Sequence, residues 1–155
     1  MSTTDEMLEK ARNNTKENGY TNVEFRKGDI EKRVPVDDNS VDLVISNCVI
    51  NLTNRVDTFK EVHRILKQGQ GRMVISDLVT DKEVHGDSVD SDKWCSCIDG
   101  ALTKENYLES IRKSGFHNPE ILEEKLYIQE EKEESDNIVD GNRRISSIVV
   151  KAVKD

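Results

Sequence analysis

The chain has 155 residues, of which 34% are hydrophobic and 35% are charged, and its formal net charge is -8. This length suits one domain with a genuine core, so we expect a single domain over residues 1–155. The acidic balance argues against binding to nucleic acid or to an anionic membrane, because phosphates require clustered Lys and Arg. The sequence shows no signal peptide and no apolar run near the roughly 20 residues of a membrane span, so we expect a cytoplasmic protein.

The first third of the chain predicts one helix and one strand. Thr3 and Glu6 form a possible capping box, and apolar residues then recur at helical spacing over residues 4–18. Residues 22–28 alternate between apolar and polar side chains, which is typical of a strand. We expect Asp29 to lie at the carboxyl end of that strand.

The central stretch predicts both a strand and a candidate site. Residues 41–45 are a short β-branched apolar run, which suits a strand buried on both faces. Ser46, Asn47 and Cys48 follow at its carboxyl end, where open parallel α/β sheets bind ligands. The alternative is that Cys48 is simply a small buried hydrophobic residue, because cysteine outside disulfides is often buried.

The remaining elements follow from the same patterns. His63 falls near an apolar helix face, where a structural histidine is the simpler interpretation than a ligand. The acidic run over residues 130–144 predicts a solvated hairpin loop. The predicted elements are a helix over 54–67, a strand over 73–79, a helix capped by Thr103 and closed by Gly115, and strands over 119–129 and 145–153.

The cysteine pattern excludes two common types of site. The chain has three cysteines (Cys48, Cys95 and Cys97) and no secretion signal, which argues against a disulfide framework. Cys95 and Cys97 are separated by one residue rather than the two of zinc and redox motifs. The three histidines are scattered, so we expect no structural zinc site.

Two stretches give the chain a family resemblance. Ser46-Asn47-Cys48-Val49-Ile50-Asn51-Leu52 and Cys97-Ile98-Asp99-Gly100-Ala101-Leu102 resemble segments of the arsenite methyltransferases, which use S-adenosylmethionine. The resemblance covers residues 5 to 127. It implies an α/β fold, a truncated Rossmann-like class I methyltransferase. The sheet would be mixed and mostly parallel, with helices on both faces and a C-terminal antiparallel hairpin.

The resemblance also implies roles for five residues. Asp29 would accept a hydrogen bond from the adenine amino group of S-adenosylmethionine, with Ile30 packed nearby, and Asn47 would lie beside the reactive methyl group. Cys48 and Cys97 would be thiolate ligands to trivalent arsenic, a soft centre that prefers sulfur donors. Cys95 has no assigned role.

The sequence departs from the family pattern before residue 4. No G-x-G-x-x-G or shorter Gly-rich loop precedes the first helix, and Ser2 falls where the family has an acidic residue for the ribose hydroxyls. The resemblance then implies that two strands are missing between residues 22–28 and 41–46. We expect the 22–28 strand to pair directly with 41–46, with a homodimer through the exposed sheet edge as a companion.

Three functions therefore remain open at the level of sequence. The chain is a methyltransferase whose activity is impaired by the missing loop, or a non-catalytic thiol module that binds metalloids. The third possibility is a remnant domain with an interaction role.

Overall fold

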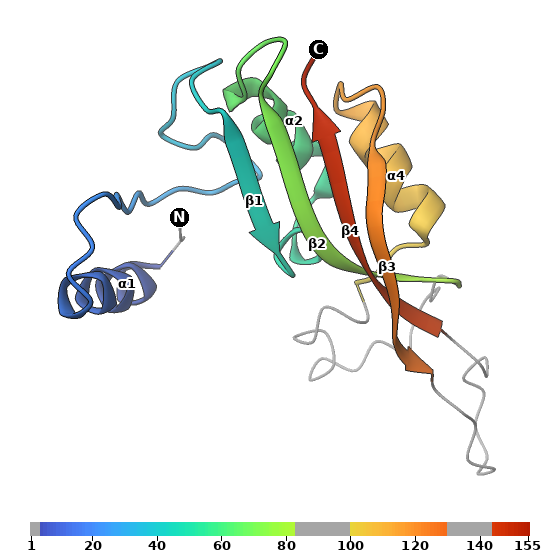
Figure 1. Cartoon of the computed structure of the whole chain (residues 1–155), viewed down its shortest axis with the longest axis horizontal. Coiled ribbons are helices and arrows are strands. Elements are labelled where there is room, and N and C mark those ends of the chain that lie inside the picture. The colour runs from blue at the N-terminus through green and yellow to red at the C-terminus, as the bar shows by residue number, and fades with distance from the viewer. Residues whose placement is uncertain (1–3, 83–99, 130–143) are drawn as a thin grey trace.

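The computed structural model describes residues 4–82, 100–129 and 144–155. Within these ranges the chain forms helices, strands and one short 3₁₀-helix, shown in Figure 1. Their order is α1 (Asp5–Glu17), β1 (Leu43–Asn47), η1 (Ile50–Leu52), α2 (Arg55–Ile65), β2 (Arg72–Thr80), α4 (Lys104–Lys113), β3 (Glu120–Gln129) and β4 (Arg144–Val153). All but one of the predicted elements that fall in the described ranges are present.

The four strands form one sheet in the order β1-β2-β4-β3. β1 runs parallel to β2, and β4 is antiparallel to both β2 and β3. The α/β class, the mixed sheet and the C-terminal antiparallel hairpin are therefore confirmed. Parallel pairing does not predominate as expected, because only the β1–β2 pair is parallel among the described strands.

The core lies between the sheet and the helices α2 and α4, which pack side by side on one face (Figure 1). Phe59 of α2 meets Tyr107 of α4 edge to face, with ring centroids 5.8 Å apart. Helix α1 lies to the side of β1 and does not cover the second face of the sheet (Figure 1). The fully buried apolar side chains of this core include Phe59, Leu66, Met73, Ile75, Tyr107, Ile111, Phe116, Ile148 and Val150.

β1 is an edge strand, and the expectation that it is buried on both faces is wrong. Leu43 is 38% exposed and Ile45 is 71% exposed, while Val44 packs against the core. The apolar run was correctly placed in a strand. However, burial on both faces requires covering elements, and only the α2 side of β1 is covered.

Residues 22–28 form no strand, which corrects the second sequence expectation. Only Lys27 in this segment makes a bridge. Arg26 instead bonds the Glu24 carboxylate, at 2.7 Å from Nε, and the Pro35 carbonyl oxygen, while Val23 is 47% exposed. The segment does not pair with β1, so the expected repair of the sheet is also wrong. Alternation alone did not produce a strand here, because a strand needs a neighbour for its backbone hydrogen bonds.

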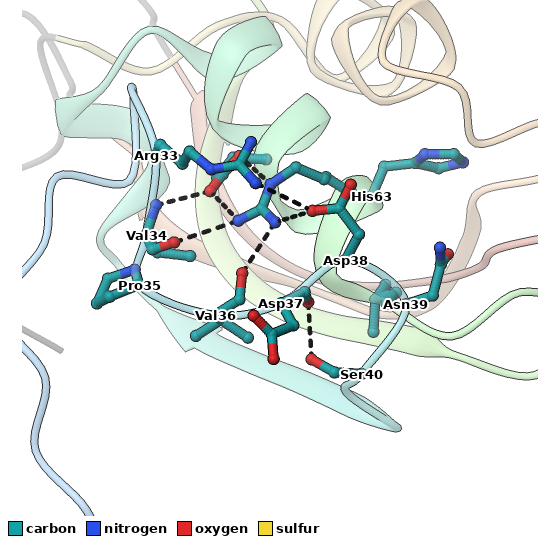
Figure 2. Close-up of polar contacts among 12 residues, drawn as sticks. Arg33, Val34, Pro35, Val36, Asp37, Asp38, Asn39, Ser40 and His63 are labelled. Atoms are coloured by element: carbon teal, nitrogen blue, oxygen red, sulfur yellow. Dashed lines mark hydrogen bonds and ion pairs between the residues drawn. The ribbon is translucent and has the colours of Figure 1, made fainter.

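A polar network fastens the segment before β1 to α2 (Figure 2). The buried Glu61 carboxylate accepts the Val34 N–H at 2.7 Å and a guanidinium N–H of Arg64 at 2.6 Å. Arg64 also donates to the Val36 carbonyl oxygen at 2.8 Å and to the Asp38 carboxylate. The Arg64 hydrogen bond lowers the pKa of Glu61 despite its burial, and Glu61 raises the pKa of Arg64. The network fixes the direction in which the chain enters β1.

The C-terminal end of α2 is held by Lys154, which is only 5% exposed. Its ammonium group donates to Asn39 Oδ1 at 2.7 Å, to the His63 carbonyl oxygen at 2.8 Å and to the Leu66 carbonyl oxygen at 3.0 Å. A cation at this position complements the negative end of the helix dipole. Burial lowers the pKa of Lys154.

His63 is a structural residue, as expected. Its ring packs edge to face against Phe116, with centroids 5.0 Å apart. Gly115 lies against the same ring with a φ of +107°, and a Cβ there would lie 3.2 Å from His63 Nε2. No group of three or more His, Cys, Asp or Glu side chains suited to a metal ion occurs within the described ranges.

Candidate functional site

The candidate site begins where β1 ends. Asn47 is exposed and is the last residue of the strand, in register with Ser76 of β2. Cys48 follows with a φ of +52°, a left-handed conformation that is uncommon for residues other than glycine. Its backbone N–H donates to the Ser76 carbonyl oxygen at 2.9 Å. This bond turns the chain sharply at the carboxyl edge of the parallel pair.

The Cys48 thiol lies half-buried above β2. Its side chain packs against the small cluster formed by Leu78 and Ile145. Burial raises the pKa of the thiol, and the negative charge of Asp77 raises it further. The thiol is therefore protonated at neutral pH, and ligand binding through the thiolate releases a proton.

A buried polar cluster joins the turn after Cys48 to β2 and α2. Asn51 of η1 donates its backbone N–H to Asp77 Oδ2 at 3.2 Å and its side-chain N–H to the Leu78 carbonyl oxygen at 2.7 Å. Arg55 donates to the Asn51 carbonyl oxygen at 3.2 Å and also to the carbonyl oxygen of Gly100. Gly100 approaches so closely that a Cβ there would lie 2.9 Å from the Asn51 carbonyl oxygen.

Sequence reasoning missed this cluster. Asp77 stands alone in a run interpreted as an apolar strand, and Asn51 and Arg55 stood out by no spacing rule. A single acidic residue inside a buried strand was the available signal, because a buried carboxylate requires hydrogen-bond donors around it.

Asp29 and Ile30 lie in the loop that reaches the start of α2. The Asp29 carboxylate accepts the Glu31 N–H at 3.0 Å and forms an ion pair with Lys32 at 3.1 Å, and the Lys32 bond lowers the pKa of Asp29. Ile30 packs against the core. The Glu31 carboxylate accepts the Asn54 N–H at 2.9 Å, which fastens this loop to the N-cap residue of α2.

Four of the five predicted site residues are thus described. Asn47 and Cys48 occupy the carboxyl edge of β1, and Asp29 and Ile30 lie in the loop tied to Asn54. Cys97 lies outside the described residues, as does Cys95, so the meeting of the two thiols stays a prediction.

Two further observations concern the surface. An open groove of about 670 Å³ runs over the ends of β2, β3 and β4 near the start of α4, with Lys104, Arg144 and Glu124 among its lining residues, and it includes none of the predicted site residues. Among the helices in the described ranges, none has the length and apolar character needed to cross a membrane.

Comparison with known proteins identifies the family. A family model described as a methyltransferase domain matches residues 3–115. The arsenite methyltransferase of Halobacterium salinarum is 41% identical over 120 residues, which are 76% of this chain and 30% of that protein. The arsenite methyltransferase of Mus musculus is 38% identical over 117 residues, 72% of this chain and 31% of that protein. The chain therefore spans about a third of the length of these curated relatives.

Comparison with solved structures gives the same family. CrArsM, an arsenic(III) S-adenosylmethionine methyltransferase from Chlamydomonas reinhardtii, matches 99% of this chain and 54% of its own, with 30% identity and a TM-score of 0.77. The YcgJ protein of Bacillus subtilis shares the fold, with 14% identity and a TM-score of 0.70 over 98% of this chain and 80% of its own. The chain therefore belongs to the methyltransferase-domain family, and the arsenite methyltransferases are its relatives within that family.

Proposed function

We propose that this chain is the arsenic-binding part of an S-adenosylmethionine-dependent methyltransferase, with Cys48 and Cys97 as the thiolate ligands. The observation that supports this best is the position of Cys48, half-buried and sharply turned at the carboxyl edge of the parallel pair β1–β2. In α/β sheets this edge is where ligands bind.

The contacts between η1 and Gly100 support the choice of Cys97 as the second thiolate ligand. Arg55 bonds both Asn51 and Gly100, and Gly100 lies against the Asn51 backbone, three residues beyond Cys48. Cys97 precedes Gly100 by three residues, and three residues span at most about 11 Å. A short connection of this length is compatible with the proposed role of Cys97 as the second ligand.

The chemistry expected of two thiols is a ligand exchange. Each thiol forms an As–S bond with trivalent arsenic hydroxide, and its proton leaves with the displaced hydroxide as water. Sulfur donors suit this soft centre, and two ligands from separate segments fix the direction of the arsenic lone pair.

The residues present fit one end of S-adenosylmethionine. Asp29 presents a partly exposed carboxylate that can accept from an amino group, Ile30 offers an apolar side chain, and Asn47 is exposed beside Cys48. When bound, this cofactor supplies an electrophilic methyl group on a sulfonium sulfur. Residues 1–155 contain no G-x-G-x-x-G loop, so we propose that these residues alone transfer methyl groups poorly.

Calorimetric titration with arsenite tests the proposal. We expect Cys48→Ser and Cys97→Ser each to weaken binding by at least about ten-fold, because one thiolate of a chelating pair is lost. Cys95→Ser is the matched control and should bind as the parent does. If both ligand variants bind arsenite like the parent chain, the thiol site does not exist.

The second candidate is a metalloid-binding module without catalysis. Arsenic binding by two thiols does not itself require the cofactor, so this alternative shares the same site. Titration with S-adenosylmethionine separates the two: arsenite binding without detectable cofactor binding at millimolar concentration identifies the module. Cofactor binding that Asp29→Asn weakens identifies the methyltransferase.

A homodimer through β1 completes the proposal. β1 contains no charged residue and leaves Leu43 and Ile45 exposed on one face, whereas β3, at the opposite edge of the sheet, carries Glu123, Glu124 and Lys125. Charged residues protect sheet edges from pairing, so a second copy of the chain is expected to pair at β1.

A further inference from the structure

The starting point is Asp77, a carboxylate that is 1% exposed in the middle of the sheet. Its Oδ1 accepts the Leu78 N–H at 3.1 Å, and its Oδ2 accepts the Asn51 N–H at 3.2 Å and the Tyr107 O–H at 3.3 Å. All three partners are donors, which suits a group that only accepts. A carboxylate is costly to bury, so its surroundings are specific to it.

Two helices hold Asp77 from the other side. Tyr107 of α4 is fully buried, and burial together with the charge of Asp77 raises the pKa of Tyr107 well above its usual value, so the hydroxyl remains a donor. Arg55 of α2 is close enough for its charge to act on Asp77, while it bonds Asn51 and Gly100. Burial nevertheless raises the pKa of Asp77.

The turn that carries Cys48 is attached to β2 at both of its ends. The Cys48 N–H bonds the carbonyl oxygen of Ser76, and the Asn51 N–H bonds the side chain of Asp77 itself. The Cys48 side chain packs against Leu78. Residues 76–78 of β2 therefore contact the turn in three ways: the Ser76 carbonyl oxygen and the Asp77 carboxylate accept its backbone N–H groups, and Leu78 packs against the Cys48 side chain.

We propose that Asp77 is a positioning residue for Cys48: by accepting the Asn51 N–H it holds the turn in the shape that presents the thiol at the carboxyl edge of β1. This inference rests on the proposed function, in which Cys48 binds arsenic. A left-handed conformation at Cys48 persists only where the surroundings enforce it. The Asp77–Asn51 bond closes the turn together with the bond from the Asn51 side chain to the Leu78 carbonyl oxygen, and of the two acceptors only Asp77 is a side chain that a substitution can remove. A displaced sulfur would misdirect the arsenic lone pair, and such alignment tolerates little error.

The chain offers a matched control for a merely structural role. Glu61 is a second buried carboxylate, 6% exposed, and it likewise accepts a backbone N–H, that of Val34 at 2.7 Å. It lies in the network that precedes β1 rather than under the thiol. Loss of either carboxylate weakens the fold, but only loss of Asp77 should change Cys48.

The experiment uses the full chain and two measurements. In the first, Cys95 and Cys97 are replaced by Ser, and the rate at which iodoacetamide alkylates Cys48 is followed at about pH 8. In the second, the chain with all its cysteines is titrated with phenylarsine oxide. Asp77→Ala, Asp77→Asn, Tyr107→Phe and Glu61→Ala are compared with the parent, each with its circular dichroism spectrum.

We expect Asp77→Ala to weaken phenylarsine oxide binding by about ten-fold or more and to raise the alkylation rate, because the turn opens and the nearby charge is lost. Asp77→Asn keeps an oxygen for the Asn51 N–H and should restore most of the affinity while alkylation stays fast. Tyr107→Phe should shift affinity and alkylation in the same direction by a smaller factor. Glu61→Ala should leave both unchanged.

Equal effects of Asp77→Ala and Glu61→Ala would overturn the proposal, as would an unchanged alkylation rate in Asp77→Ala. If Asp77→Ala does not fold, Tyr107→Phe decides, because it removes a hydrogen bond that holds Asp77 and leaves the charge of Asp77 in place. Alkylation at the parent rate in that variant contradicts the positioning role. If the parent chain fails to bind phenylarsine oxide, the proposed function fails. The alkylation rates alone then decide whether Asp77 positions Cys48.

Discussion

The buried side chain of Lys154 connects three parts of the fold and contributes to its stability. Its three hydrogen bonds join β4's end to Asn39 and to the last carbonyl groups of α2. Lys154→Met keeps much of the volume and removes every donor, so we expect the free energy of unfolding to fall by about 2 kcal/mol. Urea titration measures it. Lys151→Met, at a partly exposed ion pair with Glu120, is the control and should change stability little.

His63 makes stability depend on pH. Burial lowers its pKa in the folded chain, and the nearby charges of Lys154 and His117 lower it further. The unfolded chain therefore binds a proton more readily, so this contribution to stability is complete above the ordinary pKa of about 6.5 and declines as the pH falls below it. Urea midpoints at acidic and neutral pH should differ less in His63→Gln than in the parent. An identical difference in both would contradict this assignment.

The elements whose ends depend on local chemistry were predictable from sequence. Thr103 caps α4 through its side chain, which accepts the Asn106 N–H at 3.3 Å, and Gly19 and Gly115 end their helices with positive φ. The apparent strand at 22–28 and the burial of β1 were mispredicted, because both depend on which segments lie beside them. The same distinction applies to the candidate site. Cys48 was predictable because it follows a strand in the sequence. The contact between Asp77 and Asn51 was not, because it depends on how separate segments pack in the fold.

The segment before β1 depends on Arg64 of α2. Arg64→Met removes its bonds to Val36 and Asp38 and leaves the Glu61 carboxylate buried without its cation. We expect a loss of about 2–4 kcal/mol at neutral pH, measured by urea unfolding. Lys60→Met, on the same helix and paired with exposed Asp57, is the control.

The difference in free energy of unfolding between the parent and Arg64→Met should become smaller in acid. Arg64 lowers the pKa of Glu61, so its contribution is present above the ordinary carboxyl pKa and is lost as the pH falls through the folded value. Parent and Arg64→Met stabilities should therefore converge below about pH 4. A gap that is still unchanged at the lowest pH at which both chains remain folded would mean that the Glu61–Arg64 pair does not carry the effect.

For the whole molecule, the uncovered face of β1 predicts its assembly. Ile45 is 71% exposed on the edge strand, and pairing with a second copy would place a neighbouring strand beside it. We expect the parent to sediment as a dimer and Ile45→Lys as a monomer, because a charge on the edge opposes strand pairing. Leu122→Lys, on the exposed face of β3, is the control and should remain dimeric. A monomeric parent chain would contradict the proposed dimer.

The position of β4 also affects how this protein can be synthesised. β4 is the last of the four strands to leave the ribosome, yet it lies between β2 and β3. Until residue 144 and those after it have emerged, β2 and β3 each present an unpaired edge to chaperones and to neighbouring nascent chains. Completion of the sheet therefore has to wait for the end of translation of this domain, and a ribosome stalled before residue 144 would hold an aggregation-prone intermediate.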